Sequence, residues 1–275
     1  MIVLGGSSRQ SLAALRVALD NTLKGVSAGD ASAISSDLFK ALVAIDSSTG
    51  LRRALTDSSR DSSSKSDLIS DLFKKSLGGP ALALLANATA LRWSAPSGIA
   101  DAIEQIAVEA EATAANLSNS LDQVQSEIFT FSKLLIENPD LRTALSERSQ
   151  SAEAKQALLK SIFGSKFSAS TNSLLAHSVE SRRARSIEKT ISAYSHAVTA
   201  RRNRVNAHIK SSIALSDGQA KKLADSLTKQ IGQPVHLNIE IDPSILGGIS
   251  IRFGDEVIDG TISNRLAEAS RALVS

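Results

Sequence analysis

The sequence matches itself when it is shifted by 90 positions, and this internal repeat restricts the possible fold more than any other feature. Residues 51–92 align with residues 141–182 without a gap, and twelve of these 42 positions are identical. The identities recur mainly at helical spacing, as in Lys65, Leu68 and Phe73, so the repeated unit is a set of packed helices and not a strand pattern. A chance resemblance between two leucine- and alanine-rich segments is the alternative, and the gapless match through both loops argues against it.

Each copy of the repeat is expected to contain several short helices. Serine and aspartate residues precede several of them as N-caps, and Pro80 and Pro96 suit the first turns of helices. For the first copy we expect helices near residues 9–23, 32–47, 51–55, 66–77 and 80–93, and a further helix from residue 96 onward. For the second copy we expect helices near residues 141–145, 153–163, 170–182 and 184–201.

A single long helix is predicted between the two copies. Apolar residues step by threes and fours from Ile99 to Leu135, and neither glycine nor proline interrupts them before Pro139. This pattern predicts one helix of about 40 residues that both copies share. A break between Asn116 and Ser120 is the competing interpretation, because asparagine and serine favour helix caps over helix interiors.

The hydrophobic period changes after residue 204 and indicates a small α/β unit. Strands are expected at residues 205–213, 235–241, 249–253 and 257–258, and helices at residues 216–231 and 262–273. Gly254 and Asp255 are expected to turn the last two strands into a hairpin. We therefore expect a mainly α chain in which two helical-bundle repeats, joined by the long helix, precede a small α/β C-terminal domain. The expected domains are residues 1–115 (first helical repeat), 116–204 (second helical repeat) and 205–275 (α/β).

Charge is distributed unevenly, although the net charge is only +3. Residues 93–132 hold six acids and no lysine or arginine, whereas residues 180–210 hold eight lysines and arginines against two acids. Such asymmetry indicates either solvated helix faces or a surface that attracts a charged partner.

The sequence contains no pattern typical of catalysis or cofactor binding. The chain lacks cysteine, and His177, His196, His208 and His236 show no paired ligand spacing, so we expect no metal site. The phosphate-binding, dinucleotide-binding and nucleophile-elbow motifs are also missing. We therefore expect a protein that is not an enzyme and needs no cofactor. The longest apolar stretch, residues 80–91, is shorter than the roughly 18–20 residues that a membrane span requires, and the N-terminus lacks a signal-peptide pattern.

Four glycines occur within fourteen positions of LGGISIRFGDEVIDGTISNRL, residues 246–266, in a stretch otherwise typical of strands. With the residues before it, this stretch resembles the C-terminal signature of the delta subunit of bacterial F-type ATP synthase, a relative of the mitochondrial oligomycin-sensitivity-conferring protein. Thr261 stands where serine is usual. The signature residues, for which we expect structural roles, are Asp242, Pro243, Gly247, Gly248, Gly254, Asp255, Asp259 and Gly260. We expect the glycines to permit tight turns and close strand packing and not to bind a ligand.

The helical part carries a second resemblance to the same family. NPDLRTALSERSQSAEAKQALLKSIF, residues 138–163, is similar to a segment of the family's N-terminal helical domain. The resemblance covers residues 121–275 well and reaches the first copy only through the repeat. Because a common delta subunit has one helical domain, this chain resembles the longer delta subunits of actinobacteria, in which the helical domain is duplicated.

The resemblance implies a mechanical function in ATP synthesis. Family members are non-catalytic stator, or peripheral-stalk, subunits of the proton-translocating ATP synthase. Their helical domain holds N-terminal helices of the alpha subunits, and their C-terminal part holds the C-terminal end of the b subunit. The chain is thus expected at the cytoplasmic face of the cell membrane, as a peripheral protein attached indirectly through the complex. Candidate groove residues for partner helices, with a core role as the alternative, are Leu12, Leu15, Leu19, Leu84, Leu85, Leu174 and Leu175.

A helical nucleic-acid-binding protein that uses the basic segment 182–210 is the alternative function. Such binding needs basic residues supported by aromatic stacking or by a helix that enters a groove. Tyr194 is the only aromatic residue of this segment. We therefore expect the stator function and no nucleic-acid partner.

Overall fold

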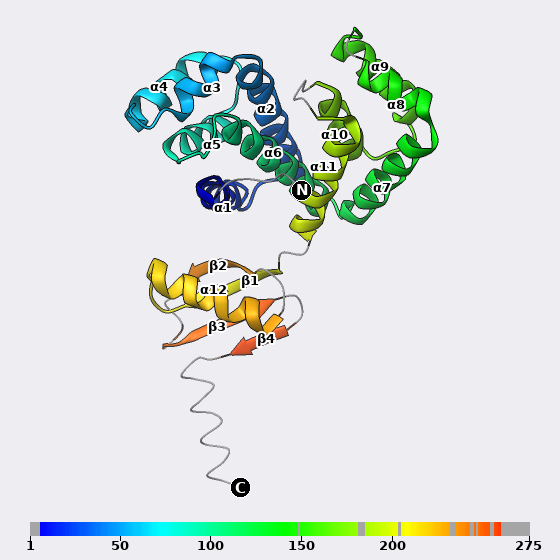
Figure 1. Cartoon of the computed structure of the whole chain (residues 1–275). Helices are drawn as coiled ribbons and strands as arrows, with labels where there is room; N and C mark the ends of the chain where they lie inside the picture. The colour runs from blue at the N-terminus through cyan, green and yellow to red at the C-terminus, as the bar shows by residue number, and fades with distance from the viewer. Residues whose placement is uncertain are drawn as a thin grey trace. The chain divides into compact units, whose positions relative to one another are not determined.

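The computed structural model describes residues 6–147, 149–180, 185–202, 205–231, 235–242, 245, 247–253 and 256–259. The chain forms two compact units, Met1–Arg201 and Arg202–Ser275 (Figure 1). The described part of the first unit is helical, and the described part of the second contains a four-stranded sheet and a helix. Within these ranges, no helix is long and apolar enough to cross a membrane.

The helices expected for both copies are present, with ends shifted by a few residues. Local sequence explains several of the starts: Ser27 forms a capping box with Asp30, and the side chains of Ser48 and Ser151 accept backbone N–H bonds at the starts of their helices. In the first copy they are α1 (Gly6–Thr22), α2 (Ala28–Ser47), α3 (Thr49–Thr56), α4 (Ser62–Phe73), α5 (Gly79–Ala90) and α6 (Ser97–Leu117). In the second they are α7 (Leu121–Glu137), α8 (Pro139–Ser146), α9 (Ala152–Phe163), α10 (Ala169–Glu180) and α11 (Ile187–Arg202).

The structure confirms the internal repeat. Helices α8, α9, α10 and α11 begin 90 residues after α3, α4, α5 and α6, respectively. The first three of them also end 90 residues after their counterparts, so the loops between these helices have the same lengths in both copies. The boundary between the repeats at residues 115 and 116 stays a prediction.

The prediction of one unbroken helix between the copies is wrong, and the competing break between Asn116 and Ser120 is correct. Asn119 has a φ of 55°, a left-handed conformation that ends a right-handed helix. The Ser120 N–H donates to the Ala115 carbonyl at 2.8 Å, and the Asn119 N–H donates to the Asn116 carbonyl at 3.0 Å. This pair of bonds is the Schellman motif, in which asparagine takes the position usually held by glycine.

Helix α6 is shared by the two copies, as the sequence predicted for the longer helix. It contacts α1, α2, α3 and α5 of the first copy and α7 and α10 of the second. Most of its residues are buried, and many of them are alanines. Small side chains allow neighbouring helices to approach from several directions, so one helix can complete both bundles.

The second unit has the α/β organisation expected from the sequence. Its elements are β1 (Val205–Ser211), α12 (Asp217–Ile231), β2 (Val235–Ile241), β3 (Ile249–Phe253) and β4 (Glu256–Asp259). The strand order is β2-β1-β3-β4; β1 and β2 are parallel, and the other two pairs are antiparallel. Ile209, Leu227 and Ile251 form its buried core. The expected closing helix at 262–273 and the turn at Gly254 and Asp255 lie outside the described residues.

Candidate functional site

Buried carboxylates on α6 are the main electrostatic feature of the helical unit. Glu104, Glu109 and Glu111 are almost fully buried, and a buried carboxylate is costly unless it is paired and hydrogen-bonded. Arg16 Nη2 lies 2.7 Å from Glu109 Oε1, and Ser32 Oγ donates to Glu111 Oε2 at 2.9 Å. Side chains of α1 and α2 therefore stabilise the acidic groups of α6 from within the first copy.

Arginines of the second copy form further ion pairs with acids of the first copy. Arg185, just before α11, forms an ion pair with Glu104, and Arg201, near the end of α11, forms one with Asp20 of α1. Arg201 Nε also donates to Thr113 Oγ1 of α6 at 2.8 Å. The expectation of solvated charged faces is wrong for these residues. Arg185 instead pairs with the acidic segment and Arg201 with α1, and both contacts connect the two copies.

A carboxylate at equivalent positions of the two copies binds the N-terminus of a neighbouring helix. Glu127 on α7 accepts hydrogen bonds from Ser168 N–H at 3.0 Å and from Ser168 Oγ at 2.7 Å, at the start of α10. Asp37 on α2, 90 positions earlier, accepts one from Gly78 N–H at 2.8 Å, at the start of α5. Burial raises the pKa of Glu127, but hydrogen bonds from side chains and from the Ser168 backbone lower it more, so the net pKa is below its ordinary value. Sequence reasoning missed this pair, although two acids 90 positions apart were a visible signal.

An aromatic contact joins the copies between α2 and the last two helices of the helical unit. The Phe39 ring stacks on the His177 imidazole, with centroids 4.1 Å apart and planes inclined by 12°, and it lies 6.1 Å from the Tyr194 ring. His177 Nδ1 is 2.7 Å from Glu180 Oε2, and Gln156 Nε2 donates to Glu180 Oε1 at 2.7 Å. Burial raises the pKa of Glu180, but its interactions with His177 and Gln156 hold it below its ordinary value. His177 therefore stacks on Phe39 of the first copy and also contacts the Glu180 carboxylate.

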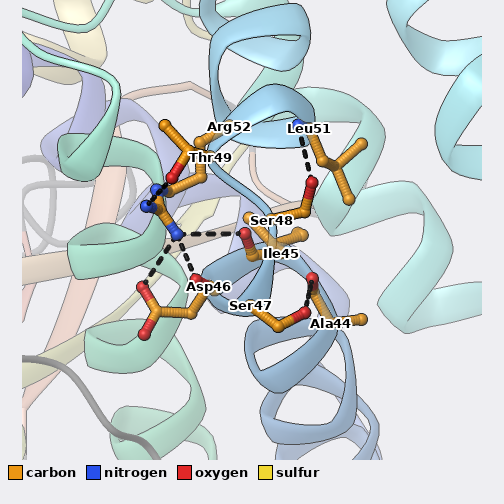
Figure 2. Close-up of polar contacts among 8 residues, drawn as sticks. All are labelled: Ala44, Ile45, Asp46, Ser47, Ser48, Thr49, Leu51 and Arg52. Atoms are coloured by element: carbon orange, nitrogen blue, oxygen red, sulfur yellow. Dashed lines mark hydrogen bonds and ion pairs between the residues drawn. The ribbon is translucent and has the colours of Figure 1, made fainter.

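Arg52 of α3 closes the C-terminal end of α2, as Figure 2 shows. Its Nη1 donates to the backbone carbonyls of Ile45, at 3.4 Å, and of Asp46, while its Nη2 donates to Thr49 Oγ1 at 3.1 Å. A cation at this end of a helix binds carbonyls that lack intrahelical partners and complements the helix dipole. The counterpart Arg142 in the second copy lies 3.7 Å from a carboxylate oxygen of α11. Both arginines of the repeated motif thus have structural contacts.

A groove of about 370 Å³ lies between α1, α6 and α11, so both copies contribute to it. Leu12, Val108 and Ala197 supply apolar lining, and the exposed Arg9 and His196 add polar groups. Its volume is at the lower end of the range for ligand pockets. No group of three or more metal-ligating side chains occurs among the described residues. The groove therefore offers mainly apolar contact, with lining from both copies.

The leucines predicted to contact partner helices all lie in the core of the helical unit. Leu12, the most exposed of them, is only 6% exposed, and it also lines the groove. This placement agrees with the core role that was the alternative for each. Direct partner contact stays a prediction for the seven residues: Leu12, Leu15, Leu19, Leu84, Leu85, Leu174 and Leu175.

The described signature residues surround the start of β3 and the end of β4. Gly247 and Gly248 have φ angles of 145° and 88°, which side-chain-bearing residues rarely adopt, so both suit a tight turn before β3. Asp242 Oδ2 lies 3.2 Å from Lys210 Nζ, and Asp259 ends β4. The structural roles expected for the signature stay predictions. Outside the described residues lie Pro243, Gly254, Asp255 and Gly260.

The arrangement defines a class of protein: a duplicated helical unit, connected internally by buried ion pairs, with a separate small α/β unit. The family model described as "ATP synthase delta (OSCP) subunit" matches residues 100–273. The chain belongs to the ATP synthase delta (OSCP) subunit family, and it is a stator subunit of the peripheral stalk.

Curated relatives match the chain over nearly its whole length. The "ATP synthase subunit delta" of Streptomyces griseus subsp. griseus is 36% identical over 270 residues, covering 98% of this chain and 99% of that protein. The protein of the same name from Streptomyces coelicolor is 37% identical over 270 residues, and the one from Thermobifida fusca is 34% identical over 268 residues; each match covers 98% of both chains. These comparisons support the stator function over the nucleic-acid alternative.

Proposed function

We propose that this chain is a non-catalytic stator subunit that connects the catalytic head of the ATP synthase to the C-terminal end of the b subunit. The observation that carries the proposal is the match to delta subunits over 98% of the chain, which includes both helical copies and the α/β unit. In this role the chain prevents the head from rotating with the rotor while protons flow.

Resistance to torque requires a helical unit that transmits load without separating into its two copies. The helix α6 belongs to both bundles, and Arg201 connects α11 to α1 and to α6. Breaking a buried ion pair leaves a charge in the interior, which costs several kcal/mol. The copies should therefore move as one body under load.

The two units are proposed to hold different partners. The helical unit holds N-terminal helices of the alpha subunits, and the α/β unit holds the end of the b subunit. The groove between α1, α6 and α11 suits one face of an amphipathic helix, because its exposed lining is mostly apolar and Arg9 at the groove can bind a carboxylate. Of the predicted partner-binding leucines, Leu12 lines this groove.

The same proposal places the chain at the cytoplasmic face of the cell membrane. Attachment there is indirect, through the b subunit. The chain is then a peripheral protein whose retention at the membrane depends on the assembled complex.

Two of the charges that motivated the nucleic-acid alternative are already paired within the helical unit. Arg185 and Arg201 form ion pairs with acids of the same unit, so they are not available to phosphates without breaking those pairs. Arg182, Arg183 and Arg204 lie outside the described residues.

Co-purification from detergent-solubilised membranes tests the proposed function. The full-length chain is expected to travel with the alpha, beta and b subunits, and a strain that lacks it is expected to lose coupling between proton flow and ATP synthesis. Partner binding should change little with salt, whereas binding to nucleic acid would weaken steeply. Fully coupled ATP synthesis in the strain without this chain would contradict the proposal.

A further inference from the structure

The two copies place the same residue in opposite environments. Phe39 on α2 and Phe129 on α7 are 90 positions apart and therefore occupy equivalent positions of the repeat. Phe39 is 1% exposed, whereas Phe129 is 70% exposed. The difference needs a physical explanation, because a large exposed aromatic side chain gains nothing for the stability of the isolated chain.

Phe39 is buried because the second copy covers it. The stacked His177 belongs to α10 and the neighbouring Tyr194 belongs to α11, so both rings come from the next repeat along the chain. Ser35, one turn before Phe39, donates to the Ala107 carbonyl of α6 at 2.8 Å in the same buried stripe. In the first copy, the Phe39 side chain therefore lies at an interface between repeats, whereas the Ser35 bond is a contact with the shared helix α6.

The equivalent face of α7 has no further repeat to cover it. Phe129 and Ile136 are two turns apart on this face, and Ile136 is 71% exposed. At the edge of the stripe, Gln125 donates to Thr199 of α11 at 3.1 Å, as Ser35 donates to α6 in the first copy. Terminal repeats of stacked proteins carry a polar outer face when that face only meets solvent. Ile136 stands where the first copy has Asp46, so this outer face carries two large apolar side chains, which is typical of an interface.

A second copy of this chain does not fit as the occupant. The surface that would repeat the Phe39 contact on another copy includes position 104, the counterpart of Tyr194, and Glu104 there is buried against Arg185. The stripe is also small, since two large side chains offer on the order of 300 Å² of apolar area, whereas a stable interface buries about 800 Å² per partner. The occupant is thus one element of a larger assembly.

We propose that the stripe formed by Phe129 and Ile136 on α7 binds one amphipathic helix of another subunit of the assembly. The contact between the repeats indicates the chemistry of this helix: it presents a flat side chain to Phe129, as the second copy presents His177 to Phe39. Lys133 and Glu137 beside the stripe pair with each other at 3.6 Å, so the contacting face of the partner is apolar and not of one charge. The proposal rests on the proposed stator function, since it needs an assembly that supplies the helix.

The absence of cysteine from the chain allows a direct test by single-cysteine labelling. The variants are Phe129→Cys and Ile136→Cys, with Leu72→Cys as the control, because Leu72 is an exposed apolar residue as well and lies on a different helix, α4. Reaction with a maleimide is timed on the isolated full-length chain and on the ATP synthase purified with each variant. A covered thiol reacts only when the interface opens, so we expect labelling at 129 and 136 to slow by about tenfold or more in the complex. Labelling at 72 should not change.

A photoreactive crosslinker attached to the thiol at position 129 identifies the occupant. We expect the crosslinked product to contain a helix of another ATP synthase subunit. Unchanged labelling at 129 in the complex, equal protection at all three positions, or a crosslink to a second copy of this chain would each overturn the proposal. If the chain never joins the complex, the proposed stator function itself is wrong. Co-purification reveals that outcome before any labelling.

Discussion

At the scale of single residues, the surroundings of a side chain decide its contribution more than its type does. Phe39 and Phe129 occupy the same position of the repeat, and only Phe39 has neighbours from a following copy. Asp37 and Glu127 differ in length, yet each accepts hydrogen bonds from the N-terminus of the next-but-two helix of its copy. The hydrogen bond from a backbone N–H to the carboxylate is thus the same in both copies, whereas the surroundings of the phenylalanine differ.

Phe39→Ala is expected to lower the free energy of unfolding by about 3–5 kcal/mol, because it leaves a cavity and removes the stack on His177. Phe129→Ala is expected to change it by less than about 0.5 kcal/mol, since the ring is mostly in water. Urea unfolding of the full chain, followed by far-UV circular dichroism, measures both. Equal losses for the two variants would show that the burial difference between the copies is wrong.

Glu127 should make the stability of the helical unit depend on pH. Its pKa in the folded chain is below the ordinary value of 4.5, so the unfolded chain binds its proton more tightly than the folded chain does. The stabilisation is therefore present above the ordinary pKa and is lost as pH falls through the lowered pKa. Glu127→Gln should lower the unfolding midpoint in urea at neutral pH, and the difference from the unchanged chain should shrink below a pH of about 4. The exposed Glu137→Gln is the control, and a pH-independent difference for Glu127→Gln would contradict the assignment.

At the scale of helices and strands, the ends of elements carry information that hydrophobic periodicity does not. The apolar pattern continues from α6 into α7 without interruption, which is why it predicts one helix. Helix α6 nevertheless ends here, because Asn119 is left-handed and the two hydrogen bonds of the Schellman motif form. After the break, Val124, Ile128 and Phe131 of α7 are buried in the core of the helical unit.

Asn119→Gly should leave the free energy of unfolding unchanged or raise it, because glycine adopts a positive φ without steric cost. Asn119→Val should lower it by roughly 1–2 kcal/mol, because a branched side chain clashes with the backbone in the left-handed region. Urea unfolding of the two variants, compared with the unchanged chain, gives both values. If valine were tolerated as well as glycine, the break would not depend on this conformation.

At the scale of the whole molecule, the two copies of the helical unit are connected by charges. Asp20, Glu104 and Glu109 belong to the first copy or to the shared helix, and two of these three pair with arginines of the second copy. Arg201 lies at the end of the helical unit and connects its last helix to its first. These ion pairs help to hold the two copies together as one helical unit.

Arg201→Ala is expected to lower the free energy of unfolding of the helical unit by on the order of 3 kcal/mol, because the buried ion pair with Asp20 and the hydrogen bond to Thr113 are both lost. Lys74→Ala, which breaks an exposed ion pair with Asp71, should cost less than about 1 kcal/mol. Hydrogen exchange on the full chain measures both and reports the two compact units separately. Equal effects of the two variants, or a loss of protection confined to the α/β unit, would contradict the role of Arg201.

Much of the fold was predictable because helical and strand periods are set by the geometry of the backbone within a few residues. The repeat, the helices of both copies and the strands of the α/β unit all follow from such local patterns. The resemblance to the ATP synthase delta family came from two short motifs and led to the function. The seven leucines illustrate the limit: periodicity showed that they face a neighbour, but not whether that neighbour is another helix of this chain or a partner.

By itself, the sequence determined that this chain is a duplicated set of helices followed by a small α/β unit of the delta family. Only the tertiary structure decided which charges meet, since Arg185 and Glu104 are 81 positions apart and Arg201 and Asp20 are 181 apart. It also decided that Phe39 is covered while Phe129 is exposed. The physical reason is that secondary structure depends on contacts within a few residues, whereas charge pairing and burial depend on which distant segments the packing of helices brings together.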